Sequence, residues 1–143
     1  MSIDNYFEKN PVLFYIGKRI MEDVLDKTNE GYIPEVANPG SDIVRSKLEC
    51  LSEEQIGVLQ ELIPWITYGM VQNMLWLFEQ NEDIQLIVDY EGKKINIAEV
   101  SNGLELDLDG WIKRFGKYKA YTSIEFEKQF KMKYGDWLNR FKD

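Results

Sequence analysis

Three carboxylates in the C-terminal half have the spacing most suggestive of chemistry. Glu105, Asp107 and Asp109 alternate with three leucines. Strict alternation is typical of a half-buried strand, and in a strand these acids would share one face at a spacing of about 7 Å. Such a row could collect Lys and Arg side chains of a basic partner, or it could be an ordinary solvated strand face.

A calcium loop is a further interpretation of the same row. Glu105 would then take loop position 1 and Gly110 position 6, which leaves Lys113 at position 9 and Gly116 at position 12. An EF-hand needs a bidentate carboxylate at position 12. We therefore exclude an EF-hand and expect no bound metal and no cofactor.

The chain has no histidine and a single cysteine, Cys50. This excludes Ser-His-Asp and Cys-His nucleophilic catalysis, and also zinc sites built from imidazole or several thiolates. Carboxylate chemistry remains, but a paired-carboxylate hydrolase needs two acids facing each other across a cleft, and no pattern in the sequence indicates one. A carboxylate-based or metal-dependent enzyme is therefore the alternative interpretation. We expect Cys50 to be a buried, unreactive thiol.

Charge is distributed unevenly along the 143 residues. Residues 1–110 carry 21 acids and 8 bases, whereas residues 111–143 carry 4 acids and 9 bases, and the net charge is −8. An acidic surface repels nucleic acids and anionic membranes and attracts basic proteins. Ordinary solubility is the alternative explanation. The basic C-terminal segment is interpreted as pairing with the acidic body or as a solvated helix face, rather than as binding nucleic acid.

Trp111 directly follows the acidic row and precedes Lys113 and Arg114. An aromatic side chain flanked by charges is typical of an interface anchor, although burial in the core is the alternative. The predicted partner-binding residues are Glu105, Asp107, Asp109 and Trp111.

The elements that must position these residues begin with helices. Asn10-Pro11 predicts a helix start, with an apolar stripe to Leu25 and a stop at residues 29–31. Residues 32–40 read as a loop, followed by a short helix to about residue 50. Ser52 to Gln55 is a capping box that opens a long helix, and Pro64 is expected to divide or kink that helix. Residues 65–80 are apolar on most sides, so we expect that part to be central and its tryptophans to be packed.

Three strands are predicted next, at 84–90, 94–100 and 104–109, with one helical turn over 110–116. A terminal amphipathic helix is predicted from Thr122, and its aromatic stripe consists of Phe126, Phe130, Tyr134, Trp137 and Phe141. The fold class is therefore α+β: N-terminal helices, a small antiparallel sheet of about three strands and a C-terminal amphipathic helix, in a single domain spanning 1–143.

Neither a signal peptide nor a membrane-spanning stretch is expected, and the lone cysteine favours the reducing cytoplasm. The profile resembles small bacterial immunity and antitoxin proteins, which neutralise a basic nuclease or other toxin by covering it. The resemblance implies a non-enzymatic acidic protein that binds a basic protein partner, with no nucleic acid and no membrane. A structural or oligomeric role is a further alternative, and the sequence leaves the oligomeric state open.

Overall fold

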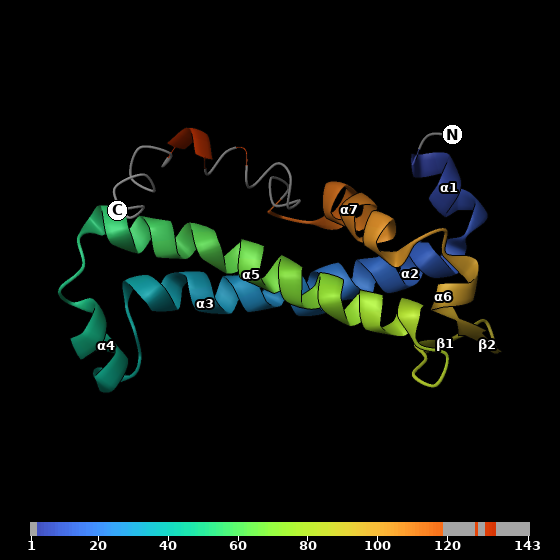
Figure 1. The fold of residues 1–143 in the computed structure, drawn as a ribbon, viewed down its shortest axis with the longest axis horizontal. Helices are drawn as coiled ribbons and strands as arrows, with labels where there is room; N and C mark the ends of the chain where they lie inside the picture. The colour runs from blue at the N-terminus through green and yellow to red at the C-terminus, as the bar shows by residue number, and fades with distance from the viewer. Residues whose placement is uncertain (1–2, 119–127, 129–130, 134–143) are drawn as a thin grey trace.

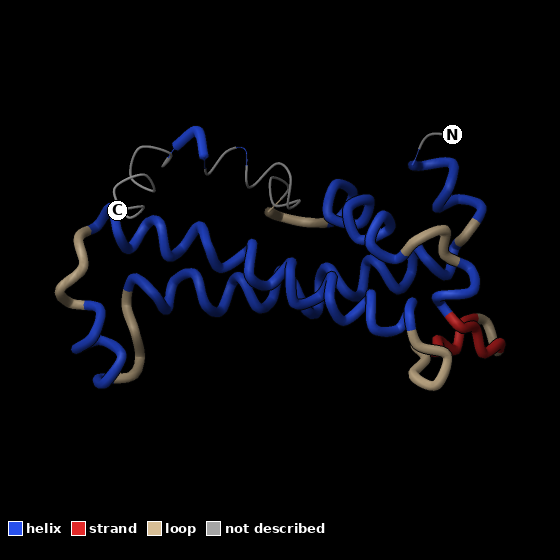
Figure 2. Tube along the Cα trace, in the orientation of Figure 1, coloured by secondary structure: helices blue, strands red, loops and turns tan. Residues whose placement is uncertain are grey.

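The computed structural model describes residues 3–118, 128 and 131–133. Within these residues the fold is α+β, because it is mostly helical with one small antiparallel sheet. Two long helical arms lie side by side along the molecule, and the sheet sits at one end of them (Figure 1; Figure 2). The predicted class is confirmed, but the sheet has two strands rather than about three.

The first arm is a continuous helical run that follows the short α1 (Ile3–Lys9). Its segments are α2 (Pro11–Ile20), the π-helical turn η1 (Met21–Asp26) and α3 (Lys27–Ala37). Pro11 occupies the first helical position, where its missing N–H would have no intrahelical partner in any case. The predicted helix start is therefore confirmed.

The predicted stop at residues 29–31 is wrong, and most of the predicted loop at 32–40 is helical, with Pro34 inside α3. Tertiary contacts hold this part in place. The Thr67 hydroxyl donates to the buried Asn29 side chain at 2.8 Å, and the Gln60 amide donates to the Ile33 carbonyl at 2.9 Å. Packing against the second arm therefore outweighs the local preferences of glycine and proline.

A short helix, α4 (Asp42–Leu48), connects the two arms. The Val44 N–H donates to the Ser41 hydroxyl at 3.5 Å, as expected of an N-cap residue. Ile43 is 75% exposed. Cys50 is exposed as well, so its predicted burial is wrong.

The second arm is α5 (Glu53–Gln80), which opens with the predicted capping box. The Gln55 N–H donates to the Ser52 hydroxyl at 3.2 Å, and the Ser52 N–H donates to the Gln55 side chain at 2.8 Å. The helix continues past Pro64, so of the two predicted effects of this proline, division or a kink, division does not occur. Only one side of it is buried, through residues at helical spacing: Pro64, Tyr68, Val71 and Leu75.

The hairpin consists of β1 (Ile87–Tyr90) and β2 (Lys93–Asn96), in which Val88 lies opposite Ile95. Glu91 and Gly92 both have positive φ, which is typical of a two-residue turn that matches strand twist. The second predicted strand ends early, because Asn96 accepts a hydrogen bond from the Ala98 N–H at 3.2 Å and starts α6 (Ile97–Val100).

The predicted third strand is wrong, since residues 104–109 begin a helix, α7 (Leu104–Phe115). Two periodicities overlap here. The alternating pattern covers six residues, whereas a stripe at helical spacing continues over twelve: Leu104, Leu108, Trp111, Ile112 and Phe115. The first four of these are buried in the core, and Leu106, which a strand would have buried, is 69% exposed.

The predicted terminal helix lies outside the described residues, apart from Lys128 and residues 131–133. In the part of the chain that is described, no helix combines the length and apolar character needed to cross a membrane.

Candidate protein-binding surface

The helical conformation of α7 separates Asp107 from the other two acids of the predicted row. Residues two apart on a helix are rotated by about 200°, so Asp107 points away from Glu105 and Asp109, which are four residues apart and lie on one side of the helix. Glu105 is exposed, Asp109 is half-buried and Asp107 is only 3% exposed. The shared acidic face that the strand prediction required is therefore absent.

Each of the two outer acids is held by a side chain of α5. The Gln72 amide donates to Glu105, and the Tyr68 hydroxyl donates to Asp109 at 2.9 Å. These hydrogen bonds connect α7 to α5, so both carboxylates help to hold the two helices together. Glu105 alone remains exposed enough to face a partner.

Asp107 is held by the loop that precedes α7. The Ser101 hydroxyl donates to its carboxylate at 2.5 Å and accepts from the Gly103 N–H at 2.9 Å. Burial raises the pKa of the Asp107 carboxyl, and hydrogen bonds from Ser101 and Tyr6 offset part of that increase. This arrangement fixes the start of α7.

Trp111 is fully buried where α7 crosses α2. A Cβ atom placed on Gly17 would lie 2.2 Å from its ring. The glycine therefore permits the close crossing, and the indole is a core residue rather than a surface anchor in this conformation.

A large exposed apolar surface lies on α5, on the sides of the helix away from its buried residues. Residues 62–78 contain no charged side chain. The side chains that we call the α5 apolar face are between 40% and 68% exposed: Trp65, Ile66, Met70, Met74, Trp76 and Leu77. The prediction that this helix is central is therefore only half right, since Trp65 and Trp76 are not packed away.

The charged side chains of α5 itself all have one sign. α5 carries Glu53, Glu54, Glu61 and Glu79 and has neither Lys nor Arg. Glu61 receives an ion pair from Lys133, one of the described C-terminal residues. Apart from that cation, the helix itself offers only negative charge beside its apolar side chains.

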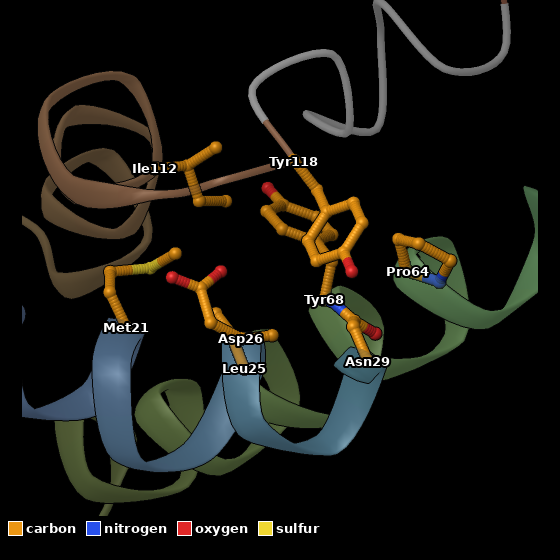
Figure 3. Close-up of a pocket in the computed structure, with 8 residues that line it drawn as sticks. All are labelled: Met21, Leu25, Asp26, Asn29, Pro64, Tyr68, Ile112 and Tyr118. Atoms are coloured by element: carbon orange, nitrogen blue, oxygen red, sulfur yellow. The ribbon is translucent and has the colours of Figure 1, made fainter. Parts of the chain in front are cut away.

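A small cavity lies between the first arm, α5 and α7 (Figure 3). Its volume is about 10 Å³, enough for roughly one water molecule. Asp26 points into it: one carboxylate oxygen accepts the Lys117 N–H at 3.3 Å, and Oδ2 has no hydrogen-bond partner. Burial raises the pKa of this carboxyl, with a smaller opposing effect of Lys117.

A second, open hollow of about 320 Å³ lies between α1, α2, β1 and α7 and is lined largely by aromatic rings. Among the described residues, Glu8 is the one acidic residue that lines this hollow, and Asp26 is the one acidic residue that lines the first cavity. Neither of these two cavities brings two carboxylates together, as a paired-carboxylate mechanism requires. The described residues also contain no cluster of three or more potential metal ligands.

Comparison of the chain with protein-family models, curated proteins and solved structures finds no match in any of the three. The surface therefore has to be interpreted from its own chemistry. Its signal was present in the sequence, since a 17-residue stretch without charge lies between Glu61 and Glu79. The pattern nevertheless predicts burial, because apolar residues on all sides of a helix normally indicate burial on all sides.

Proposed function

We propose that this protein is a non-catalytic, acidic binding protein that binds a basic protein partner through the α5 apolar face. The observation that carries the proposal is the set of six large apolar side chains exposed along one uncharged stretch of helix. Contiguous exposed apolar surface of this kind marks interaction sites in proteins. A partner that covers it removes apolar area from water, which stabilises the complex.

Charge supports the choice of a basic partner. The acids of α5 and the net charge of −8 attract cationic proteins and repel anionic ones. Complementary charge at the rim of an interface speeds association and selects the partner. Glu105 keeps a place in this proposal as an exposed acid beside α5, whereas Asp107 and Trp111 support the fold from within.

The specific form of the proposal is an immunity- or antitoxin-type inhibitor that covers a basic toxin or nuclease in the cytoplasm. The acidic composition and the lack of histidine support an inhibitor more than a catalyst. The exposed thiol of Cys50 is compatible with a reducing compartment.

The test is a charge placed in the centre of the α5 apolar face. We expect Met70→Lys to weaken binding of the captured native partner by roughly tenfold or more, because it buries a cation against a basic surface. Leu106→Lys is the matched control, since Leu106 is 69% exposed and Met70 is 68% exposed. Affinities of both variants are measured by calorimetry after their thermal unfolding has been compared with that of the wild type.

Equal loss of affinity in both variants would show that general charge, and not the α5 apolar face, governs binding. Unchanged affinity in Met70→Lys would remove this face from the interface. An acidic captured partner would contradict the proposal as a whole.

A further inference from the structure

The α5 apolar face has a notch at its centre. Trp65 and Trp76 are 11 residues apart, which places them about 16 Å apart along the axis and within about 20° of one another around it. Gly69 lies between them, and a Cβ atom placed there would meet no other atom within 4 Å. Two large exposed rings therefore flank a position where the helix backbone itself is accessible.

We infer that the partner binds through an amphipathic α-helix, apolar on one side and bordered by Lys and Arg, which crosses α5 over Gly69 between the two tryptophans. This inference rests on the proposed function and adds the mode of recognition. It identifies the partner by the shape and charge of the element it presents.

The dimensions favour a helix. A helix with its side chains is about 10–12 Å wide, which fits between rings that project from positions about 16 Å apart. Helices that pack against each other have axes roughly 8–10 Å apart, and a glycine at the crossing allows the closest of these approaches. Met70 and Ile66 lie beside the notch and are 68% and 54% exposed, so they supply apolar contact at the crossing.

The charges favour a cationic helix over a second copy of this chain. Two α5 helices face to face would bring four acids against four, with no Lys or Arg on either helix. Like charges across an interface oppose association. The same acids disfavour an anionic lipid surface. A helix bordered by Lys and Arg meets opposite charge at Glu79, at one end of the uncharged stretch, whereas Glu61 at the other end already forms an ion pair with Lys133.

The test uses a synthetic 18-residue peptide of leucine and lysine arranged as an amphipathic helix, with a leucine–glutamate peptide of the same pattern as the charge control. Fluorescence anisotropy measures binding of each labelled peptide to the full chain. We expect the lysine peptide to bind, with affinity that falls as salt is raised, and the glutamate peptide not to bind at the same concentrations.

The decisive variant is Gly69→Leu, which fills the notch without changing any charge. We expect it to weaken binding of the lysine peptide at least tenfold. Gly57→Leu is the matched control, because it lies in the same helix and also has no atom within 4 Å of its Cβ position. We expect that control to change affinity less than twofold. Circular dichroism of both variants checks that the fold is retained.

Equal affinity of Gly69→Leu and wild type for the lysine peptide would overturn the inference. The lysine peptide could fail to bind while Met70→Lys still abolishes binding of the native partner. That result would contradict recognition through a helix and would still support the proposed function. Self-association in sedimentation that Met70→Lys abolishes would assign the face to a second copy instead. Binding to phosphatidylcholine vesicles that Met70→Lys abolishes would assign it to lipid.

Discussion

Asp26 and Asp107 are the two buried carboxylates of the described residues, and their oxygens are satisfied differently. Asp107 accepts a short hydrogen bond from the Ser101 hydroxyl. Asp26 accepts only from the Lys117 N–H at 3.3 Å, and its Oδ2 has no partner. A buried, poorly satisfied carboxylate destabilises the folded state when it is ionised. The ionised form of Asp26 therefore lowers the stability of the folded state.

We expect Asp26→Asn to raise the free energy of unfolding at pH 7 by about 1 kcal/mol, since it replaces a buried ion by a neutral group of the same shape. Burial raises the pKa of Asp26 above its ordinary value of 3.8, even though Lys117 opposes this increase. The folded state thus binds the proton more tightly than the unfolded state. The stability that the protonated Asp26 carboxyl contributes is fully present below the unfolded pKa and is lost as pH rises through the folded pKa.

The measurement is urea unfolding of wild type and Asp26→Asn between pH 7 and pH 4. The wild type should gain stability as pH falls through the folded pKa of Asp26, and the variant should lose that part of the gain. Asp107, whose pKa is also raised, contributes with the same sign in both proteins. Identical pH dependence of the two proteins would show that Asp26 has the same pKa in the folded and unfolded states.

At the scale of elements, the crossing of α2 and α7 depends on a missing side chain. Trp111 of α7 lies directly against Gly17 of α2 and is fully buried. The arrangement lets the largest side chain of the core fill the space that a β-carbon would occupy. The two helices are thereby fixed at a distance that no other residue at position 17 allows without movement.

We expect Gly17→Ala to lower the free energy of unfolding by about 3 kcal/mol, because the new methyl group forces Trp111 to shift within a packed core. Gly57→Ala is the control: its Cβ position is open, so it should raise stability by up to about 1 kcal/mol through helix propensity. Denaturant unfolding at neutral pH measures both. Stabilisation by Gly17→Ala would contradict the close crossing.

At the scale of the whole molecule, charge and apolar surface lie together. The first 110 residues hold 21 of the 25 acids, and α5, which carries the exposed apolar face, has acids and no bases. Apolar contact in the proposed complex supplies affinity, and the acidic surroundings supply steering. The two contributions respond differently to salt, since screening weakens charge attraction and leaves apolar burial in place.

We expect the association rate with the basic partner to fall by about tenfold between low and high salt, while the dissociation rate changes much less. Stopped-flow mixing at several salt concentrations measures both rates. An association rate that rises with salt would indicate repulsion, as between two acidic copies of this chain, and would contradict a basic partner.

Much of the fold could be predicted from the sequence, because local signals specify it. Proline at the first position of α2, the capping box at Ser52 and the turn at Glu91-Gly92 each satisfy or constrain the backbone within a few residues. The α+β class and the acidic character of the first 110 residues also follow from sequence alone.

Only the tertiary structure decided where the candidate surface lies. Residues 104–109 fit a strand and a helix equally well over a short window, and burial of Trp111 against Gly17 selects the helix. For α5, the sequence determined that Trp65 and Trp76 are apolar, but exposure depends on which sides neighbouring helices cover. α3 and α7 cover one side of α5 and leave the other open. A residue's own chemistry sets its preference for burial, whereas the geometry of packed neighbours determines whether burial is achieved.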